Sequence, residues 1–274
     1  MPGEVRFGTQ GWVYPSWRGV FYPKGLKADR ELSYYATRFD AVEVDSTFYA
    51  RPPRERVERW REATPPGFVF SLKVPRAITH EAGLEGAEDE IARFLERVSV
   101  LGERLGPVVF QFPGSFRFGA ERLERLASVL DRRPEGVSFA VEFRHRGWFN
   151  PEVLAALGEK RAAVVWSDHR AVPALDAPTG DFLYVRLLGD HDAPLPDFSA
   201  VRDERTGELR AWADRLRPHV AAGRRLFVFT NNHFEGHSPS TATRLRDLLG
   251  VAAPSLPFVD PEGTGEPGLF DGPG

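Results

Sequence analysis

The chain of 274 residues contains no cysteine, which excludes disulfide bonds and metal sites built from thiolates. It also lacks any apolar run close to the roughly 20 residues of a membrane-spanning helix. Its charges nearly balance: the net charge is -3 and the pI is about 6.2, so any anion-binding surface must be local. Because MPGEVRFGTQ leads directly into a strand-like segment without a signal peptide, we expect a cytoplasmic protein with no membrane partner.

Eight short apolar segments predict β-strands that recur along most of the chain. They alternate with segments of helical period, and eight such units over about 250 residues are typical of a single (β/α)₈ barrel of the TIM type. A doubly wound open sheet is the main alternative, but GTQGW after the first strand lacks the third glycine of its phosphate-binding turn. The predicted strands are residues 5–9, 41–45, 68–73, 108–112, 139–143, 162–168, 182–188 and 225–231.

Helices are predicted by apolar stripes and by their termini. An Asn-Pro pair at 150–151 and a Ser-Pro pair at 238–239 indicate helix starts, and Gly250 indicates the end of the last helix. The unit between strands six and seven is irregular, because the segment that joins them is short and holds two prolines. We therefore predict a barrel domain over residues 1–250 and a Pro/Gly-rich tail, draped or disordered, over 251–274. The apolar stripes lie in residues 30–39, 89–101, 121–130 and 209–216.

Alternate side chains of a barrel strand face the interior and the surrounding helices in turn. In FAVEF (139–143) the two phenylalanines and Val141 form the apolar set that faces helices, which leaves Glu142 and the following Arg144 inside. The same sorting predicts inward charges near the C-terminal ends of four other strands, where barrel active sites are built. These predicted inward charges nearly cancel: Glu43, Asp45, Glu142, Asp168, Lys73, Arg144 and Arg186.

Histidine and aromatic residues gather in the loops at the same end. Six of the seven histidines follow predicted strands: His80, His145, His169, His191, His233 and His237. The first loop is rich in aromatic residues, among which Trp12 comes nearest to a strand end, and the fifth loop adds Trp148. We expect an aromatic, locally basic mouth.

Seven segments, spread over about residues 6–233, resemble segments of the YecE-like family and occur in the same order. This family is number seventy-two in a catalogue of domains of unknown function. The resemblance implies a TIM-type barrel and no established reaction, because the family is named for lacking one. Its barrel is similar to those of metal-dependent apurinic endonucleases and sugar isomerases, which is an analogy of fold alone. The family usually carries Asn where this chain has Asp45. The segments are GTQGWVYPSWRGVFYP, YYATRFDAVEVDSTFYARPP, FVFSLKVPRAITH, VVFQFP, VEFRHRGWF, YVRLLG and TNNH.

The preferred hypothesis is an enzyme that acts on an anionic, ring-bearing substrate such as a sugar phosphate, a nucleotide or nucleic acid. The catalytic candidates are Glu142, Asp168 and His145, with one carboxylate relaying a proton. Arginine neighbours should keep Glu142 ionised at neutral pH, and the same contacts equally fit a structural ion pair. The substrate-binding candidates are Trp12, Glu43, Lys73, His80, Gln111, Arg144, Trp148, Tyr184, Arg186, Asn231 and Asn232.

Two alternatives belong to other classes. A metal-dependent nucleic-acid hydrolase would need a divalent ion, but three basic residues share the cavity and no HExxH or HxH spacing occurs. We therefore predict no cofactor, with a divalent metal as the lesser alternative, on Glu43, His80, Glu142, His145 and Asp168. The other alternative is a non-catalytic module that binds a small anionic or polyhydroxylated ligand.

Overall fold

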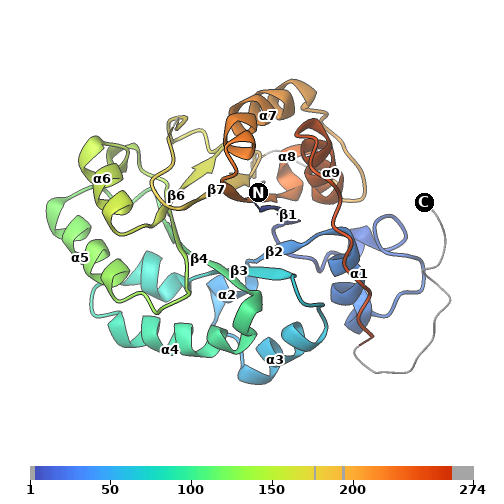
Figure 1. Cartoon of the computed structure of the whole chain (residues 1–274), viewed down its shortest axis with the longest axis horizontal. Helices are drawn as coiled ribbons and strands as arrows, with labels where there is room; N and C mark the ends of the chain where they lie inside the picture. Colours follow the sequence, from blue (N-terminus) through green and yellow to red (C-terminus); the bar gives the residue numbers. More distant parts are fainter. Residues whose placement is uncertain (1–3, 176, 193–194, 261–274) are drawn as a thin grey trace.

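Eight parallel strands form a nearly closed barrel in the computed structural model, which describes residues 4–175, 177–192 and 195–260 (Figure 1). Hydrogen-bonded neighbours follow the order β1-β8-β7-β6-β5-β4-β3-β2, and every pairing is parallel. The predicted (β/α)₈ fold is confirmed. The strands are β1 Val5–Thr9, β2 Ala41–Val44, β3 Val69–Lys73, β4 Leu105–Phe112, β5 Phe139–Phe143, β6 Ala163–Ser167, β7 Phe182–Leu187 and β8 Arg225–Thr230.

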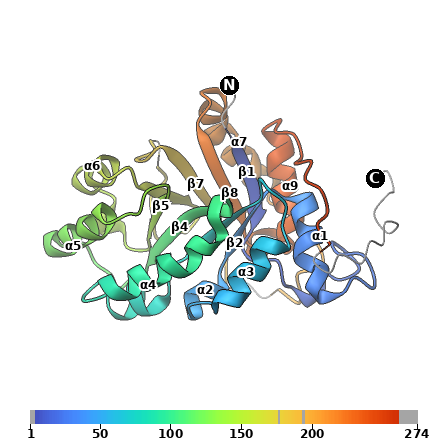
Figure 2. The same ribbon diagram turned by 60° about the horizontal axis from the view of Figure 1, so that its bottom comes forward.

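Helices surround the strands in both views of the ribbon (Figures 1 and 2). Within the described part of the chain, no helix is long and apolar enough to cross a bilayer. Short 3₁₀ or π turns precede or follow several helices. The helices are α1 Glu31–Arg38, α2 Ser46–Tyr49, α3 Arg54–Glu62, α4 Glu88–Val98, α5 Ala120–Asp131, α6 Pro151–Glu159, α7 Thr206–Ala221, α8 Asn232–Glu235 and α9 Ser238–Leu248.

Two of the three predicted helix-end signals, Asn150 and Gly250, are confirmed, and the third, Ser238, is wrong. At α6 the Asn150 side chain accepts a hydrogen bond from Val153 N at 3.0 Å, as expected of an N-cap. At α9, however, the predicted cap Ser238 is the first helical residue, because its hydroxyl donates instead to Asn232 Oδ1 at 2.9 Å. Gly250 follows α9 with φ +66, the left-handed conformation predicted for the helix end.

The segment between β6 and β7 contains no helix among its described residues, as its prolines predicted. The part of the tail at 251–260 has no regular secondary structure but packs on the barrel. Leu256 reaches Gly67 in the turn before β3, and Asp260 pairs with Arg30 at 3.3 Å. Residues 261–274 of the predicted tail lie outside the described residues.

Buried apolar residues divide into two clusters, which match the predicted alternation of strand side chains between the barrel interior and the helices. A small cluster fills the barrel interior with residues such as Val109, Ala140 and Phe229, and a large cluster fills the layer between strands and helices. In β5, Ala140 belongs to the inner cluster, whereas Phe139 and Phe143 belong to the outer one. The inner cluster leaves room above it for polar side chains at the C-terminal ends of the strands.

The seam between β1 and β2 is held by side chains, among them Tyr35 and Asp40, and by one isolated bridge rather than by a strand ladder. Tyr35 Oη accepts a hydrogen bond from Thr9 N at 2.8 Å and donates to Ala41 O at 3.1 Å. Only Gln10 and Glu43 form a bridge between the two strands in the described chain. Gly8 permits this arrangement, because a Cβ there would lie 2.0 Å from Ala41 O.

Candidate functional site at the barrel mouth

Four ionisable side chains meet inside the barrel, and we call them the central ion-pair cluster: Glu43, Glu142, Arg144 and Arg186. Arg186 donates from Nη2 to Glu43 Oε1 at 2.6 Å and from Nη1 to Glu142 Oε2. Arg144 donates from Nε to Glu142 Oε1 at 2.5 Å. Three of the four are at most 2% exposed, so the pairing compensates the loss of hydration. The alternation of side chains along the strands thus correctly predicted that these residues meet inside the barrel.

The cluster reaches solvent through Asp45 and Lys73 at the ends of β2 and β3. Lys73 Nζ lies 3.4 Å from Asp45 Oδ1 and 4.3 Å above the Phe48 ring. Asp45 also lies 3.6 Å from Arg186, and its side chain is 33% exposed. This carboxylate, which the sequence interpretation left out of the site, therefore forms part of the rim.

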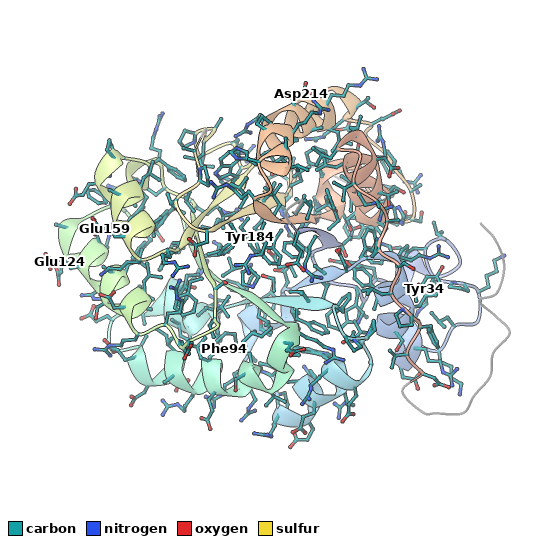
Figure 3. The ribbon with its side chains drawn as sticks, viewed as in Figure 1. Tyr34, Phe94, Glu124, Glu159, Tyr184 and Asp214 are labelled. Atoms are coloured by element: carbon teal, nitrogen blue, oxygen red, sulfur yellow. The ribbon has the colours of Figure 1, made fainter. Side chains whose placement is uncertain are left out.

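A chain of three short oxygen contacts lies beside the ion pairs, around Tyr184 at the centre of Figure 3. Tyr184 Oη lies 2.6 Å from Glu43 Oε2 and 2.7 Å from Ser71 Oγ, and Ser71 Oγ lies 2.7 Å from Pro107 O. Each contact needs one hydrogen, and the two hydroxyl groups supply only two. An ionised Glu43 would accept from Tyr184 and leave one contact without a hydrogen, so we infer that Glu43 is a neutral acid that supplies the third. Burial raises the pKa of Glu43 in the same sense, against the opposing charge of Arg186.

Glu142 has the opposite protonation state. Its burial would raise the pKa, but the charges of Arg144, Arg186 and Lys73 outweigh burial and bring the pKa to about 2. The prediction that Glu142 is ionised at neutral pH agrees with this value. A carboxylate held so strongly is a weak proton acceptor, and its contacts orient the two arginines.

The depressed pKa of Glu142 predicts a loss of stability in acid. Its ionised form stabilises the fold fully above the unfolded-state pKa of 4.5, and this contribution is lost as the pH falls toward about 2. The shift corresponds to roughly 3 kcal/mol. Urea unfolding of the wild type and Glu142→Gln should show a difference that shrinks across this range. A difference independent of pH between 7 and 2.5 would contradict the assignment.

A cavity of about 540 Å³ opens beside the cluster between the loops that follow β5, β6 and β7, and we call it the rim cavity. Arg144, His169, His191 and Arg205 are among its lining residues. Burial lowers the pKa of both histidines, and nearby charges including Arg144 lower it further, which favours neutral imidazoles. His169 Nδ1 accepts from Ala171 N at 3.2 Å, so the proton of the neutral ring lies on Nε2.

Asp168 lines this cavity but its carboxylate is committed to the backbone. Its two oxygens accept from Leu188 N at 2.6 Å and Gly189 N at 2.8 Å. Asp168 follows the last residue of β6 and lies at the mouth, as predicted, but it shares the parity of Trp166 in the helix layer and makes no ion pair with the central cluster in the described structure. Gly189 is needed in this loop, because it has φ +69 and a Cβ would lie 2.1 Å from His233 O. Asp168 therefore shapes the loop after β7.

Three other predicted site residues pack away from the ion pairs. His145 Nδ1 accepts from Gly147 N at 3.1 Å and caps the turn Arg146–Trp148, and it does not line the rim cavity. Trp148 is 0% exposed and stacks on Phe143 with ring centroids 4.5 Å apart, which leaves no surface for a ligand. Trp12 packs edge-on against Trp60 of α3, with centroids 5.7 Å apart.

The predicted amides have structural partners. Asn231 caps α8 by accepting from His233 N at 2.9 Å, and it donates to Gln10 Oε1 at 2.8 Å. Asn232 Oδ1 accepts from Ser238 N at 2.9 Å. Gln111 Nε2 donates to Phe112 O at 3.2 Å and approaches His80 Nε2 at 3.5 Å. The two asparagines thus fix the loop after β8.

Sequence reasoning left several residues out of the site. His169 and His191 were assigned to the mouth as loop histidines but not to the site, although their positions after strands gave a usable signal. Ser71 alternates with Phe70 and Leu72 in β3, so parity placed it inside, but its contact with Tyr184 joins residues 113 positions apart. Arg205 precedes α7 and carried no signal in the sequence.

The described residues do not group metal ligands at this mouth. Within residues 4–175, 177–192 and 195–260, no cluster of three or more His, Asp or Glu side chains is arranged to hold a metal ion. The cationic groups of Lys73, Arg144 and Arg186 occupy the positions between the carboxylates.

Comparisons with known proteins agree with the barrel and with the sequence resemblance. The family model described as "Protein of unknown function DUF72" matches residues 6–264. The chain belongs to this family. A crystal structure of a DUF72 family protein from Thermotoga maritima superposes with a TM-score of 0.78 and 27% identity, covering 90% of this chain and 99% of that one.

Curated relatives of this DUF72 chain match over shorter stretches. The UPF0759 protein YecE of Escherichia coli K12 is 36% identical over 145 residues, which is 53% of this chain and 50% of YecE. The UPF0759 protein YunF of Bacillus subtilis 168 is 30% identical over 155 residues, which is 54% of this chain and 53% of YunF. The chain thus matches about half the length of these relatives, and their names state no reaction.

Proposed function

We propose that the rim cavity binds an anionic ligand through Arg144, as the substrate site of an enzyme. The observation that carries the proposal is the incomplete pairing of this guanidinium. Arg144 uses Nε for Glu142, and in the described structure its two Nη groups have no protein partner. An arginine edge of this kind presents several N–H donors in the planar arrangement that suits a phosphate or a carboxylate.

The charge balance of the mouth supports the same ligand class. With Glu43 neutral, the cationic groups are Lys73, Arg144 and Arg186, and the anionic groups are Asp45 and Glu142. Three positive charges against two negative ones leave one positive charge beside Arg144. The lining of the rim cavity also carries four acids (Asp168, Asp190, Asp192 and Glu208) against Arg144, Arg170 and Arg205, so the attraction for an anion is local to the Arg144 side.

The neutral histidines supply the groups for proton transfer. In this proposal His169, whose Nε2–H faces no competing acceptor among its described hydrogen bonds, replaces Glu142 and Asp168 as the candidate acid–base residue. A cavity of about 540 Å³ accommodates a ligand the size of a sugar phosphate or a nucleotide. The proposed substrate is therefore a small, ring-bearing phosphate or carboxylate.

The proposal is tested by calorimetry and thermal shift with inorganic phosphate, ribose 5-phosphate, adenosine monophosphate and citrate. At least one organic anion is expected to bind, and Arg144→Met should weaken its binding at least tenfold, since one lost charged hydrogen bond is worth about 1.5–3 kcal/mol. Arg161→Met is the matched control, because Arg161 is exposed and pairs with Asp181 at 2.6 Å outside the mouth. Absence of binding by all four anions, or equal binding by Arg144→Met, would contradict the proposal.

The two other candidate functions are separated in the same experiment. A metal-dependent hydrolase of nucleic acid requires a divalent ion for binding or cleavage, so a chelator would abolish its response. A binding module would release the bound ligand chemically unchanged after prolonged incubation. The grouping of cations around Arg186 favours a metal-independent anion site.

A further inference from the structure

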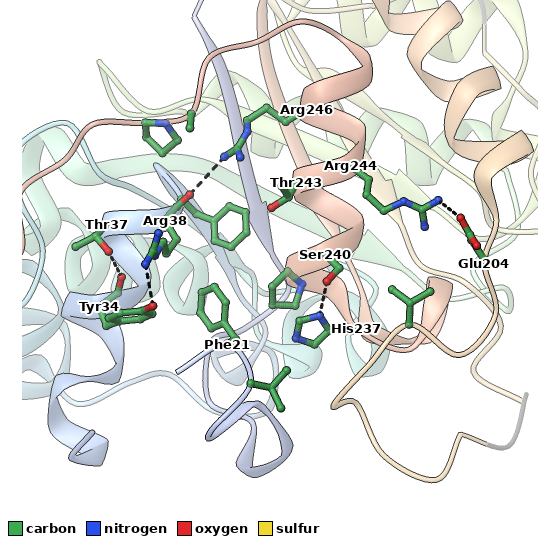
Figure 4. Close-up of a pocket in the computed structure, with 16 residues that line it drawn as sticks. Phe21, Tyr34, Thr37, Arg38, Glu204, His237, Ser240, Thr243, Arg244 and Arg246 are labelled. Atoms are coloured by element: carbon green, nitrogen blue, oxygen red, sulfur yellow. Dashed lines mark hydrogen bonds and ion pairs between the residues drawn. The ribbon is translucent and has the colours of Figure 1, made fainter. Parts of the chain in front are cut away.

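A second cavity lies outside the barrel, between α1 and α9, and we call it the outer groove (Figure 4). Its volume is about 890 Å³, larger than that of the rim cavity. Phe21 from the first loop lines one side, and Ala253 and Pro254 from the tail complete the wall. The two cavities have no lining residue in common, so the outer groove is a separate site.

Arg246 of α9 is a buried cation with few partners in this groove. It is 8% exposed, and its Nη1 donates to Arg38 O at 3.5 Å, the limit of a hydrogen bond. Its Nε has no hydrogen-bond partner among the described residues, and its ion pair with Asp247 Oδ1 is long, at 3.8 Å. One hydrogen bond at the distance limit and one long ion pair offset only part of the cost of burying a guanidinium.

Arg38 and His237, which also line the outer groove, likewise have fewer hydrogen-bond or ion-pair partners than their side chains can accept or donate to. Arg38 Nη2 donates to Tyr34 Oη at 3.1 Å, and no carboxylate in the described ranges lies within ion-pair distance of its guanidinium. His237 is 6% exposed; its Nδ1 contacts Ser240 Oγ at 2.7 Å, and its Nε2 has no partner in the described chain. Arg244 in the same groove differs, since Glu235 and Glu204 neutralise it at 2.6 and 2.8 Å.

The remaining lining is apolar and lies close to these cations. Phe21 and Phe39 are stacked with ring centroids 5.9 Å apart, and Pro239 lines the groove at the start of α9. We propose that the outer groove binds a small organic anion with an apolar ring, whose head group pairs with Arg246 and Arg38 and whose ring packs on Phe21 and Pro239. The head group is a carboxylate or a phosphate ester.

Titration calorimetry with the full chain tests this proposal with three ligands that share one ring system. We expect 2-naphthoate or 2-naphthyl phosphate to bind at least tenfold more tightly than neutral 2-naphthol, and the better of the two anions identifies the head group. Arg246→Met should lower that affinity at least tenfold while the melting temperature stays the same or rises, because the buried charge is removed. Arg38→Gln, at an exposed position, should also lower the affinity.

Two controls separate this site from others. Arg144→Met alters the rim cavity and should leave binding of the anionic naphthyl ligand unchanged, and so should Arg93→Met on the exposed face of α4. No binding by either anion, equal binding by 2-naphthol, or full binding by both Arg246→Met and Arg38→Gln would overturn the proposal.

Discussion

Replacing Glu142 with Gln is expected to lower the free energy of unfolding by roughly 3–5 kcal/mol at pH 7, the usual cost of breaking a buried ion pair from one side. Glu142 accepts from both Arg186 and Arg144, and its exposed fraction is 1%. A glutamine keeps the shape but brings an amide N–H group toward one guanidinium. The buried charge of Arg186 would then depend on Glu43, which is neutral, and on Asp45 at 3.6 Å.

The matched variant Glu43→Gln should change the free energy of unfolding by about 1 kcal/mol or less, although Glu43 is equally buried. A glutamine has the same donor and acceptor as a protonated glutamate: its amide can donate to Tyr184 and its carbonyl can accept from Arg186. The native state thus loses neither an ionic contact nor a hydrogen bond of the oxygen chain.

Urea unfolding of both variants at pH 7 provides the comparison, and infrared spectroscopy of protein with labelled glutamate provides a direct readout. The wild type should show the carbonyl band of a protonated carboxylic acid, and Glu43→Gln should lose it. Equal destabilisation by the two substitutions, or absence of this band from the wild type, would show that Glu43 is ionised and that the hydrogen count is wrong.

The substitution Tyr35→Phe removes one oxygen atom and is expected to cost about 2–4 kcal/mol. The hydroxyl group serves Thr9 N and Ala41 O, two buried backbone groups at the seam between β1 and β2. Each group left without a partner costs about 1–3 kcal/mol, and no water can replace the hydroxyl in a seam where Tyr35 is fully buried. The loss should exceed that from an ordinary surface hydroxyl.

Thermal or urea unfolding measures this effect, and hydrogen exchange localises it. The Thr9 amide should exchange much faster in Tyr35→Phe, whereas amides of β4 and β5 should change only through global stability. Tyr34→Phe is the control on the same helix, because the hydroxyl of Tyr34 accepts from the exposed Arg38 side chain. A Tyr35→Phe protein as stable as Tyr34→Phe would mean that the seam is not held by this hydrogen bond.

The sequence predicted much of the ion-pair cluster because strand parity is a local property. Once eight parallel strands are assigned, alternation alone assigns Glu43, Ser71, Glu142 and Arg186 to one side, and the parallel direction assigns their ends to one mouth. Asp168 shares the parity of Trp166, so alternation did not assign it to the ion pairs, and the structure places it in the lining of the rim cavity.

Which groups touch, and in which protonation state, was decided only by the tertiary structure. The inferred neutral state of Glu43 depends on a chain of contacts through Tyr184, Ser71 and the Pro107 carbonyl. With Glu43, these residues come from four strands, β2, β7, β3 and β4. No spacing along the chain encodes these distances, since they follow from the closure and register of the barrel. The commitment of Asn231 and Asp168 to neighbouring loops has the same origin.

The sequence by itself determined the absence of thiol chemistry, the barrel, the end of the barrel where charge gathers, and the ionised state of Glu142. The tertiary structure decided the partners of each charge, the free edge of Arg144, the side-chain closure of the β1–β2 seam and the groove around Arg246. The physical reason is range: periodicity and charge act between near neighbours in the chain, whereas hydrogen bonds and desolvation act between atoms that only the folded chain brings together.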